Sequence, residues 1–267
     1  MFIDCHVHLD SFSDTEVGEV LARAREVGVV AVISAGTTVT STLRSVQLSA
    51  IYPGFFSGVG IHPMDVREPF TDLTYQQLRA AATSSDKVLV ISEIGLDFMD
   101  GAPDRAMQYH AFRQQVGLAR ELELPIVFHS RESHSEVFRV LREERAFEVG
   151  GVMHYFQADL DTANRAIDLG FYVSLARPLL RLPRLQEAAA RIPLSSIVLE
   201  TDAAPQPFKS KRENWTEPRH VATVAQKLAE LHGVPLERVE ESAMRNIKNV
   251  LGAGWETVER HLKIAPV

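Results

Sequence analysis

The sequence predicts an α/β protein, a single-domain (β/α)8 TIM barrel that takes up residues 1–267. Eight short runs rich in Val, Ile or Phe alternate with amphipathic stretches. This alternation is typical of parallel βα units, because parallel neighbours need long crossovers. Eight units fit the usual size of such a barrel, and a chain of this length can bury a sizeable core. An open doubly wound sheet is the alternative, but no Gly-rich nucleotide-binding loop follows any of the runs.

The predicted strands end near Gly, Pro, Ser or a polar cluster, as strands usually do. In chain order they are expected at residues 2–6, 29–35, 55–61, 88–93, 126–129, 151–154, 171–175 and 197–200. Between them, apolar residues recur at the spacing of amphipathic helices. Helices are expected at residues 14–27, 104–122, 133–145, 161–169, 217–232 and 235–251, and a short tail follows. Asp14 is the expected N-cap of the first helix.

Composition and charge narrow the class of protein. The chain has 28 Lys and Arg against 35 Asp and Glu, so its formal charge is −7 with neutral histidines. This balance disfavours a protein that coats nucleic acid by bulk charge, although a local basic site remains possible. We expect no membrane association, since no apolar run has the length of a membrane span and the first residues lack a signal-peptide pattern. The single cysteine, Cys5, gives no sign of an oxidising compartment, so we expect a cytoplasmic protein.

The first strand carries three polar residues at alternate positions, Asp4, His6 and His8. Side chains alternate across a strand, so these three are expected to share the inward face. Barrel enzymes place their chemistry at the C-terminal ends of the strands, where two such histidines can reach one metal ion. The residues between them are expected to face the covering helices: Ile3, Cys5 and Val7.

Further imidazoles and carboxylates follow other predicted strands, namely His62, Glu93, His129, His154 and Asp202. With the pair in the first strand, five of the ten histidines lie at strand ends. A satisfied core role explains one histidine better than the whole set, because buried charge needs a partner or a metal. Imidazoles with carboxylates suit Zn²⁺, Mn²⁺, Fe²⁺ or a less selective divalent site. The carboxylate of Glu93 can bridge two cations, which indicates a binuclear hydrolytic centre.

Six short motifs stand at these strand ends. They are D-x-H-x-H at 4–8, G-x-H-P at 60–63, E-I-G-L-D at 93–97, H-S-R at 129–131, H-Y-F at 154–156 and E-T-D at 200–202. Together and in this order, they resemble the TatD family of metal-dependent deoxyribonucleases, within the amidohydrolase-like metal-dependent hydrolases. The resemblance extends over the full chain and implies a barrel with two divalent cations, either Mg²⁺, Mn²⁺ or Zn²⁺.

The resemblance also implies a set of ligands for each ion. The first ion would be held by His6, His8, Glu93 and Asp202. Glu93 would bridge to a second ion, which His129 and His154 would also hold.

Catalytic and substrate-binding roles follow from the same resemblance. Asp202 would orient or deprotonate the attacking water, beside the bridging Glu93. His62 would lie near the scissile phosphate, and Arg131 could neutralise a phosphate oxygen. The implied reaction is hydrolysis of phosphodiester bonds in DNA, as single strands or strand ends, and often by trimming from the 3′ end.

Some positions depart from the family pattern, and they lie where substrate would meet the barrel. Ser92 stands before Glu93 where the family usually has Gly. The loops after the last two strands are rich in basic and aromatic residues, namely Arg177, Arg181, Arg184, Phe208, Lys209, Lys211, Arg212 and Trp215. Such residues can contact phosphates and stack on bases, or they can form an ordinary solvated face on which Trp215 packs. Asp97 is expected to have a structural role, such as capping the next helix, rather than to contact substrate.

Two other functions remain open at this point, because metal ligands alone do not identify a substrate. One is a hydrolase of the same superfamily that acts on a small-molecule ester or amide. The other is a metal-binding barrel without catalysis, which the intact set of candidate residues disfavours.

Overall fold

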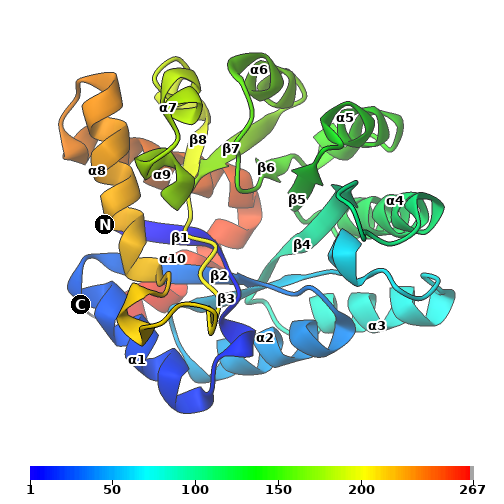
Figure 1. Cartoon of the computed structure of the whole chain (residues 1–267). Coiled ribbons are helices and arrows are strands. Elements are labelled where there is room, and N and C mark those ends of the chain that lie inside the picture. Colours follow the sequence, from blue (N-terminus) through cyan, green and yellow to red (C-terminus); the bar gives the residue numbers. More distant parts are fainter. Residues whose placement is uncertain (265–267) are drawn as a thin grey trace.

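Eight parallel strands form a nearly closed barrel in the computed structural model, which describes residues 1–264 (Figure 1). Each strand pairs with the next one along the chain, in the order β1 to β8. The strands are β1 (Phe2–Val7), β2 (Val29–Ala35), β3 (Phe55–Val59), β4 (Val88–Asp97), β5 (Ile126–Arg131), β6 (Gly151–Met153), β7 (Phe171–Leu175) and β8 (Ile197–Leu199). The predicted barrel is therefore confirmed, with strand bounds that differ by a few residues at the C-terminal ends.

Helices surround the strands in a ring, as Figure 1 shows. They are α1 (Asp14–Glu26), α2 (Val39–Ile51), α3 (Asp72–Thr83), α4 (Arg105–Glu121), α5 (His134–Glu143), α6 (Leu160–Asp168), α7 (Pro183–Ala189), α8 (Val221–His232), α9 (Leu236–Leu251) and α10 (Trp255–Ile264). The expected N-cap at Asp14 is wrong by one residue. Ser13 caps α1, because its side chain accepts a hydrogen bond from the backbone N–H of Glu16, whose own side chain accepts one in return.

The ring of strands closes between β1 and the segment just after β8. Val7 bridges Ala203, and the backbone N–H of His8 donates to the carbonyl of Ala203 at 2.8 Å. The backbone N–H of Asp202 donates to the carbonyl of His6 at 3.0 Å. The closure therefore places the end of the first strand directly beside Asp202, although the two are far apart in sequence.

Two apolar layers share the strands between them. The larger layer packs the outward faces of the strands against the surrounding helices. The smaller layer, which we call the interior cluster, fills the barrel with Ile3, Cys5, Ala31, Ile33, Phe56, Leu89, Val90, Val127, Val152 and Val198.

The expected facing of the first strand is therefore partly wrong. Ile3 and Cys5 lie in the interior cluster rather than toward the helices, while Val7 packs in the outer layer as predicted. The pairing of β1 with β2 shifts register between Asp4 and Val7. A register shift of this kind breaks the strict alternation of side chains, so both Cys5 and His6 can belong to the inside of the barrel.

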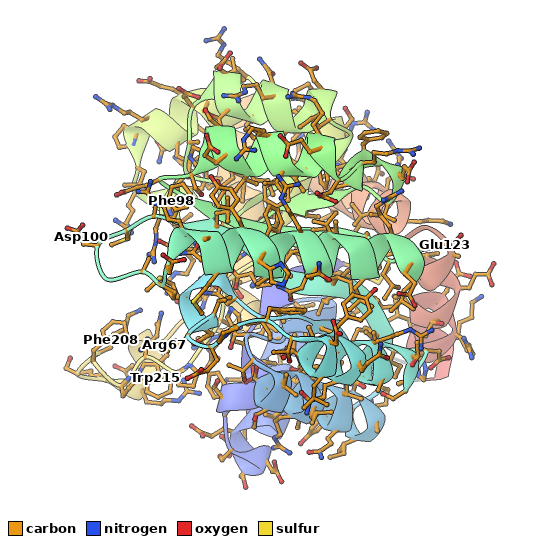
Figure 2. The ribbon with its side chains drawn as sticks, turned by 90° about the vertical axis from the view of Figure 1, so that its right-hand side faces the viewer. Arg67, Phe98, Asp100, Glu123, Phe208 and Trp215 are labelled. Carbon is orange, nitrogen blue, oxygen red and sulfur yellow. The ribbon has the colours of Figure 1, made fainter. Side chains whose placement is uncertain are left out.

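The C-terminal helices cover the end of the barrel opposite the loops that follow the strands. Ile247, Val250 and Leu251 of α9 and Trp255 and Val258 of α10 complete the interior cluster. In Figure 2 these red helices lie on the right with Glu123, and the loops carrying Phe98 and Phe208 lie on the left. The expected short tail after residue 251 is wrong, because α10 forms there. Among residues 1–264, no helix has the length and apolar character that crossing a bilayer requires.

Removal of the Trp255 side chain should destabilise the whole barrel. Its indole is 9% exposed and packs in the interior cluster, so Trp255→Ala should lower the free energy of unfolding by about 3 kcal/mol. Chemical denaturation measures this change. Leu73→Ala is the control, because Leu73 is 69% exposed and its loss should change stability by less than about 0.5 kcal/mol.

Candidate metal centre

The carboxylate of Glu93 is the centre of the polar cluster at the C-terminal end of the barrel. Glu93 lies in β4, is 3% exposed, and faces five imidazoles that come from four other parts of the barrel. They belong to His6, His8, His62, His129 and His154. The structure thus brings together all the predicted histidines, none of which is close to Glu93 in sequence.

The two oxygens of Glu93 face different imidazoles. Its Oε2 lies 3.4 Å from Nε2 of His6 and 3.5 Å from Nε2 of His8. Its Oε1 lies 3.0 Å from Nδ1 of His129, 3.4 Å from Nε2 of His154 and 3.3 Å from Nε2 of His62. The carboxylate therefore divides the cluster into two groups of nitrogen atoms, one at each oxygen.

Asp202 belongs to the group at Oε2. Its Oδ1 lies 3.3 Å from Nε2 of His8. Ligand atoms of Asp202, His6 and His154 also lie within 4.8 Å of one another, so the ring of His154 is within reach of both groups. The backbone of Asp202 is left-handed, with φ of 55°, a conformation that non-glycine residues adopt at some cost and often at functional sites. Asp4, which was expected on the same face as the histidines, instead accepts hydrogen bonds from the backbone and hydroxyl of Thr201. It therefore fixes the residue next to Asp202.

The spacing of these atoms fits divalent ions. The Nε2 atoms of His6 and His8 are 3.2 Å apart. Ligand atoms at about 2.0–2.1 Å from one tetrahedral ion lie about 3.3 Å from each other, so this separation and those around Glu93 match shared coordination. Imidazole and carboxylate ligands in this number suit a transition-metal or similarly permissive divalent site. The donor set thus supports metal binding on either side of Glu93.

Two buried carboxylates orient histidines of the cluster, and the sequence analysis gave neither of them this role. Asp97 lies 2.9 Å from Nε2 of His129, which leaves Nδ1 of that ring to face Glu93. Glu200 lies 3.0 Å from Nδ1 of His154, which leaves Nε2 to face Glu93. Such carboxylate partners fix the tautomer and direction of a metal-binding imidazole. Their place at strand ends within the E-I-G-L-D and E-T-D motifs was the available signal.

Asp97 also fixes Arg131, whose Nε and Nη2 donate to its Oδ2 at 2.8 and 2.6 Å. Arg131 is 46% exposed, so its guanidinium can still meet a ligand. The expectation that Asp97 has a structural role agrees with these contacts, but helix capping is not that role. Asp104 is the N-cap of α4, and it accepts from the backbone N–H of Met107.

His62 differs from the metal-binding candidates in which of its ring nitrogens carries the proton. Its Nδ1 accepts a hydrogen bond from the backbone N–H of Met64 at 3.1 Å. A neutral imidazole that accepts at one nitrogen carries its proton on the other, so Nε2 of His62 is a donor. A metal ligand needs an unprotonated nitrogen, which sets His62 apart from the metal-binding candidates although it lies close to Glu93.

A glycine on the neighbouring strand β3 leaves space for Ser92. A Cβ on Gly58 would lie 2.8 Å from Cβ of Ser92 and 2.9 Å from a methyl group of Val90. Ser92 is 1% exposed. The serine that departs from the family pattern is therefore accommodated by the missing side chain of Gly58.

The carboxylates and imidazoles of the cluster shift one another's pKa values. Burial alone would raise the pKa of Glu93, but the facing imidazoles of His62, His154 and His129 hold it well below its usual range. Burial also opposes protonation of His8 and His154. The carboxylates of Asp202 and Glu93 nevertheless raise the pKa of His8 to about 9, and those of Glu200 and Glu93 raise the pKa of His154 to about 10. Without metal, the cluster therefore holds protons that cations can replace.

Loss of the carboxylate behind His154 should weaken metal binding. Glu200→Gln keeps the shape of the side chain but removes the charge that orients the ring and makes it more basic, so metal affinity should fall about 10–100-fold. Isothermal titration of the metal-free protein with Mn²⁺ measures the loss. Glu121→Gln is the control, because Glu121 pairs with Arg79 on the surface away from the cluster. Equal affinities of Glu200→Gln and wild type would contradict this role.

Metal-free protein should lose stability as the pH rises from about 6.5 to 10. In this window the folded protein retains protons on His8 and His154 that unfolded imidazoles have released. Their stabilising contribution is complete below pH 6.5 and is lost as the pH passes the folded pKa values of about 9 and about 10. Bound metal should stabilise the protein more as the pH rises, because it replaces these protons.

Thermal melts with chelator and with Mn²⁺, at a series of pH values, measure both trends. The difference in Tm between wild type and His8→Gln isolates the contribution of one imidazole. A difference that does not change with pH in the metal-free protein would contradict the raised pKa of His8.

The chain is similar over most of its length to proteins named as metal-dependent hydrolases. A family model described as TatD related DNase matches residues 3–252. YabD of Bacillus subtilis, called an uncharacterized metal-dependent hydrolase, is 31% identical over 258 residues, which cover 94% of this chain and 98% of YabD. The human deoxyribonuclease TATDN3 is 30% identical over 257 residues, which cover 91% of this chain and 92% of TATDN3.

Among solved structures, the TatD homologue YjjV of Escherichia coli is similar to this fold with a TM-score of 0.86 and 28% sequence identity. The similarity covers 94% of this chain and 97% of YjjV. The match of the family model, the relatives and the structural neighbour lead to one conclusion: the chain belongs to the TatD family of metal-dependent hydrolases.

Proposed function

We propose that this protein hydrolyses phosphodiester bonds of DNA with two divalent metal ions, and that it removes nucleotides from strand ends. The observation that carries this proposal is the division of the Glu93 carboxylate, with two imidazoles at Oε2 and two ligand imidazoles at Oε1. A carboxylate in this position is suited to bridge two ions. Support for DNA comes from relatives named as deoxyribonucleases.

In this proposal, His6, His8, Glu93 and Asp202 hold the first ion, and Glu93, His129 and His154 hold the second. Among Mg²⁺, Mn²⁺ and Zn²⁺, the imidazole nitrogens favour Zn²⁺, whereas the carboxylates also suit Mn²⁺ and Mg²⁺. When bound, a pair of ions supplies Lewis acidity that stabilises charge on phosphoryl oxygens and lowers the pKa of water.

Asp202 is the proposed base for the attacking water. Burial opposes its charge, but the hydrogen bond from His8 and the charges of His154 and His8 hold the pKa of Asp202 well below its usual range. It therefore stays ionised and can orient a water by accepting its hydrogen bond. Its side chain is 29% exposed, so substrate can reach it from solvent.

His62 and Arg131 are the proposed contacts to the scissile phosphate. Nε2 of His62 carries the proton that a phosphate oxygen would accept, since its Nδ1 is engaged with Met64. The guanidinium of Arg131 is fixed in direction by Asp97 and remains partly exposed. A cavity of about 210 Å³ lies between Arg131 and the loop after β6, lined by His129, His154, Arg131, Tyr155 and Phe156 among others. It can receive the group next to that phosphate.

A hydrolase of small esters or amides remains the second candidate function, because the same centre activates water for both reactions. The partly exposed cationic side chains around the mouth favour an anionic polymer. We also propose that the chain acts as a single domain. The predicted cytoplasmic location stays a prediction.

Asp202→Asn should lower the rate of DNA hydrolysis by about 10²–10⁴-fold, the range expected for loss of a general base. The assay follows release of nucleotides from single strands labelled at either end, with enzyme loaded with Mn²⁺. Asp65→Asn is the matched control, since Asp65 is exposed in the loop just after His62 and has no proposed role. Metal titration of each variant shows whether a lower rate follows from metal loss.

Three outcomes decide between the candidates. Terminal release of nucleotides by wild type, with a low rate for Asp202→Asn, supports the proposal. Cleavage of small esters or amides with intact DNA would favour the second candidate. Tight metal binding without hydrolysis of any substrate would favour a barrel that only binds metal.

A further inference from the structure

The basic residues of the loop after β8 fall into two groups. Arg212 pairs with Glu217 at 3.0 Å and with Glu16 at 3.5 Å, and its guanidinium stacks 4.4 Å above the ring of Trp215. Lys211 lies 3.6 Å from Glu213. These two cations are engaged within the protein, and Trp215 packs against the rim beside Phe12. Arg212 and Lys211 could bind a ligand only by giving up one of these contacts.

Arg177 and Lys209 are different. They line a cavity of about 540 Å³ together with Ser210, Glu213, Asn214 and His220. Arg177 donates to the hydroxyl of Thr216 at 3.0 Å, and Lys209 donates to the carbonyl of Asn214 at 2.9 Å. Within residues 1–264, neither has a carboxylate at ion-pair distance, although Glu213 lies on the rim in contact with Lys211. Both side chains are half-buried, so their charges are partly accessible to an anionic ligand.

His220 adds a third donor to the same cavity. Its Nδ1 lies 2.9 Å from the backbone nitrogen of Glu217 and 3.1 Å from the carbonyl oxygen of Glu217. In the tautomer in which Nδ1 accepts from the backbone N–H, Nε2 carries the proton of the neutral ring. Burial and the nearby charges of Arg177 and Arg219 lower the pKa of His220, and burial and Arg177 lower the pKa of Lys209. The cavity therefore brings two cations and an imidazole together, with the carboxylate of Glu213 also on its lining.

The cavity lies at the same end of the barrel as the proposed catalytic centre and includes none of its residues. Arg177 follows β7, and Lys209 lies in the segment that begins just after Asp202. Strands β7 and β8 are neighbours in the barrel. Phe208, the residue before Lys209, is 80% exposed and lies at the mouth side of the molecule in Figure 2. An exposed aromatic ring next to a basic cavity is suited to stack on an unpaired base.

We propose that Arg177, Lys209 and His220 form a second subsite, which binds a backbone phosphate of a nucleic-acid strand whose scissile bond lies at the metal centre. This inference rests on the proposed function and adds to it a polymer-binding site that includes none of the metal ligands. A guanidinium, an ammonium and a neutral imidazole N–H give the cavity donors for several oxygens of one phosphate. Phe208 stacks on the adjoining base.

The test compares Lys209→Gln with Lys211→Gln, which removes the same charge from the same loop outside the cavity. The probe is a fluorescent single-stranded oligothymidylate with phosphorothioate linkages, which resist hydrolysis, bound to Mn²⁺-loaded enzyme. Fluorescence anisotropy at several salt concentrations gives the affinity and its salt dependence. Lys209→Gln should weaken binding about tenfold, because a charge-assisted hydrogen bond is lost. The plot of log association constant against log salt concentration has a negative slope. In Lys209→Gln its magnitude should decrease by about 0.7, the value for one phosphate contact of a single strand.

Additional variants keep the result decisive. Lys209→Arg should restore most of the affinity. Phe208→Ala should weaken binding without a change in slope, because stacking releases no counterion. Arg177→Gln should resemble Lys209→Gln. If Arg177→Gln melts early through loss of its bond to Thr216, the Lys209 variants decide alone.

The proposal is overturned if Lys209→Gln and Lys211→Gln have the same affinity and the same salt slope. Failure of the proposed function would give a different result, because wild type would then leave an ordinary oligonucleotide uncut. In that case, a difference between Lys209→Gln and Lys211→Gln would still show the subsite.

Discussion

The negative charge of Glu93 must be neutralised by neighbouring groups, because this carboxylate is buried from solvent. The charge of Glu93 requires partners, and five imidazoles from the surrounding strands and loops provide them. Those imidazoles are in turn held by Asp97, Glu200 and Asp202. The result is a network in which acids and bases alternate around one residue, and such a network is ready to exchange its protons for divalent cations.

Barrel closure is what assembles this network. His6, His8 and Asp202 meet because β1 lies beside the segment after β8, where backbone hydrogen bonds join His6 to Asp202 and His8 to Ala203. On the opposite end, α9 and α10 complete the interior cluster and seal the barrel. The open end is thus left for polar chemistry. The loops around it carry Arg177 and Lys209, which have no carboxylate at ion-pair distance among residues 1–264.

The sequence predicts the barrel and the members of the cluster well, because strands, strand ends and motifs are local patterns. It does not predict the facing of Ile3 and Cys5, since a register shift in β1 breaks the alternation on which that prediction depends. The orienting roles of Asp97 and Glu200 depend on which strands are neighbours. Arg212 is paired with carboxylates and Lys209 is not, and this difference depends on which carboxylates the folded loop brings near. The packing of α10 against the end of the barrel likewise depends on the tertiary fold.

The central claim is that Glu93 bridges two ions. A crystal structure of the protein soaked in Mn²⁺, with anomalous data, tests it most directly. The claim predicts two anomalous peaks about 3.5–4 Å apart, one at each oxygen of Glu93. It also predicts that His129 binds through Nδ1 and His154 through Nε2, with His62 bound to neither ion. A single peak, or two peaks that do not share Glu93, would contradict the claim.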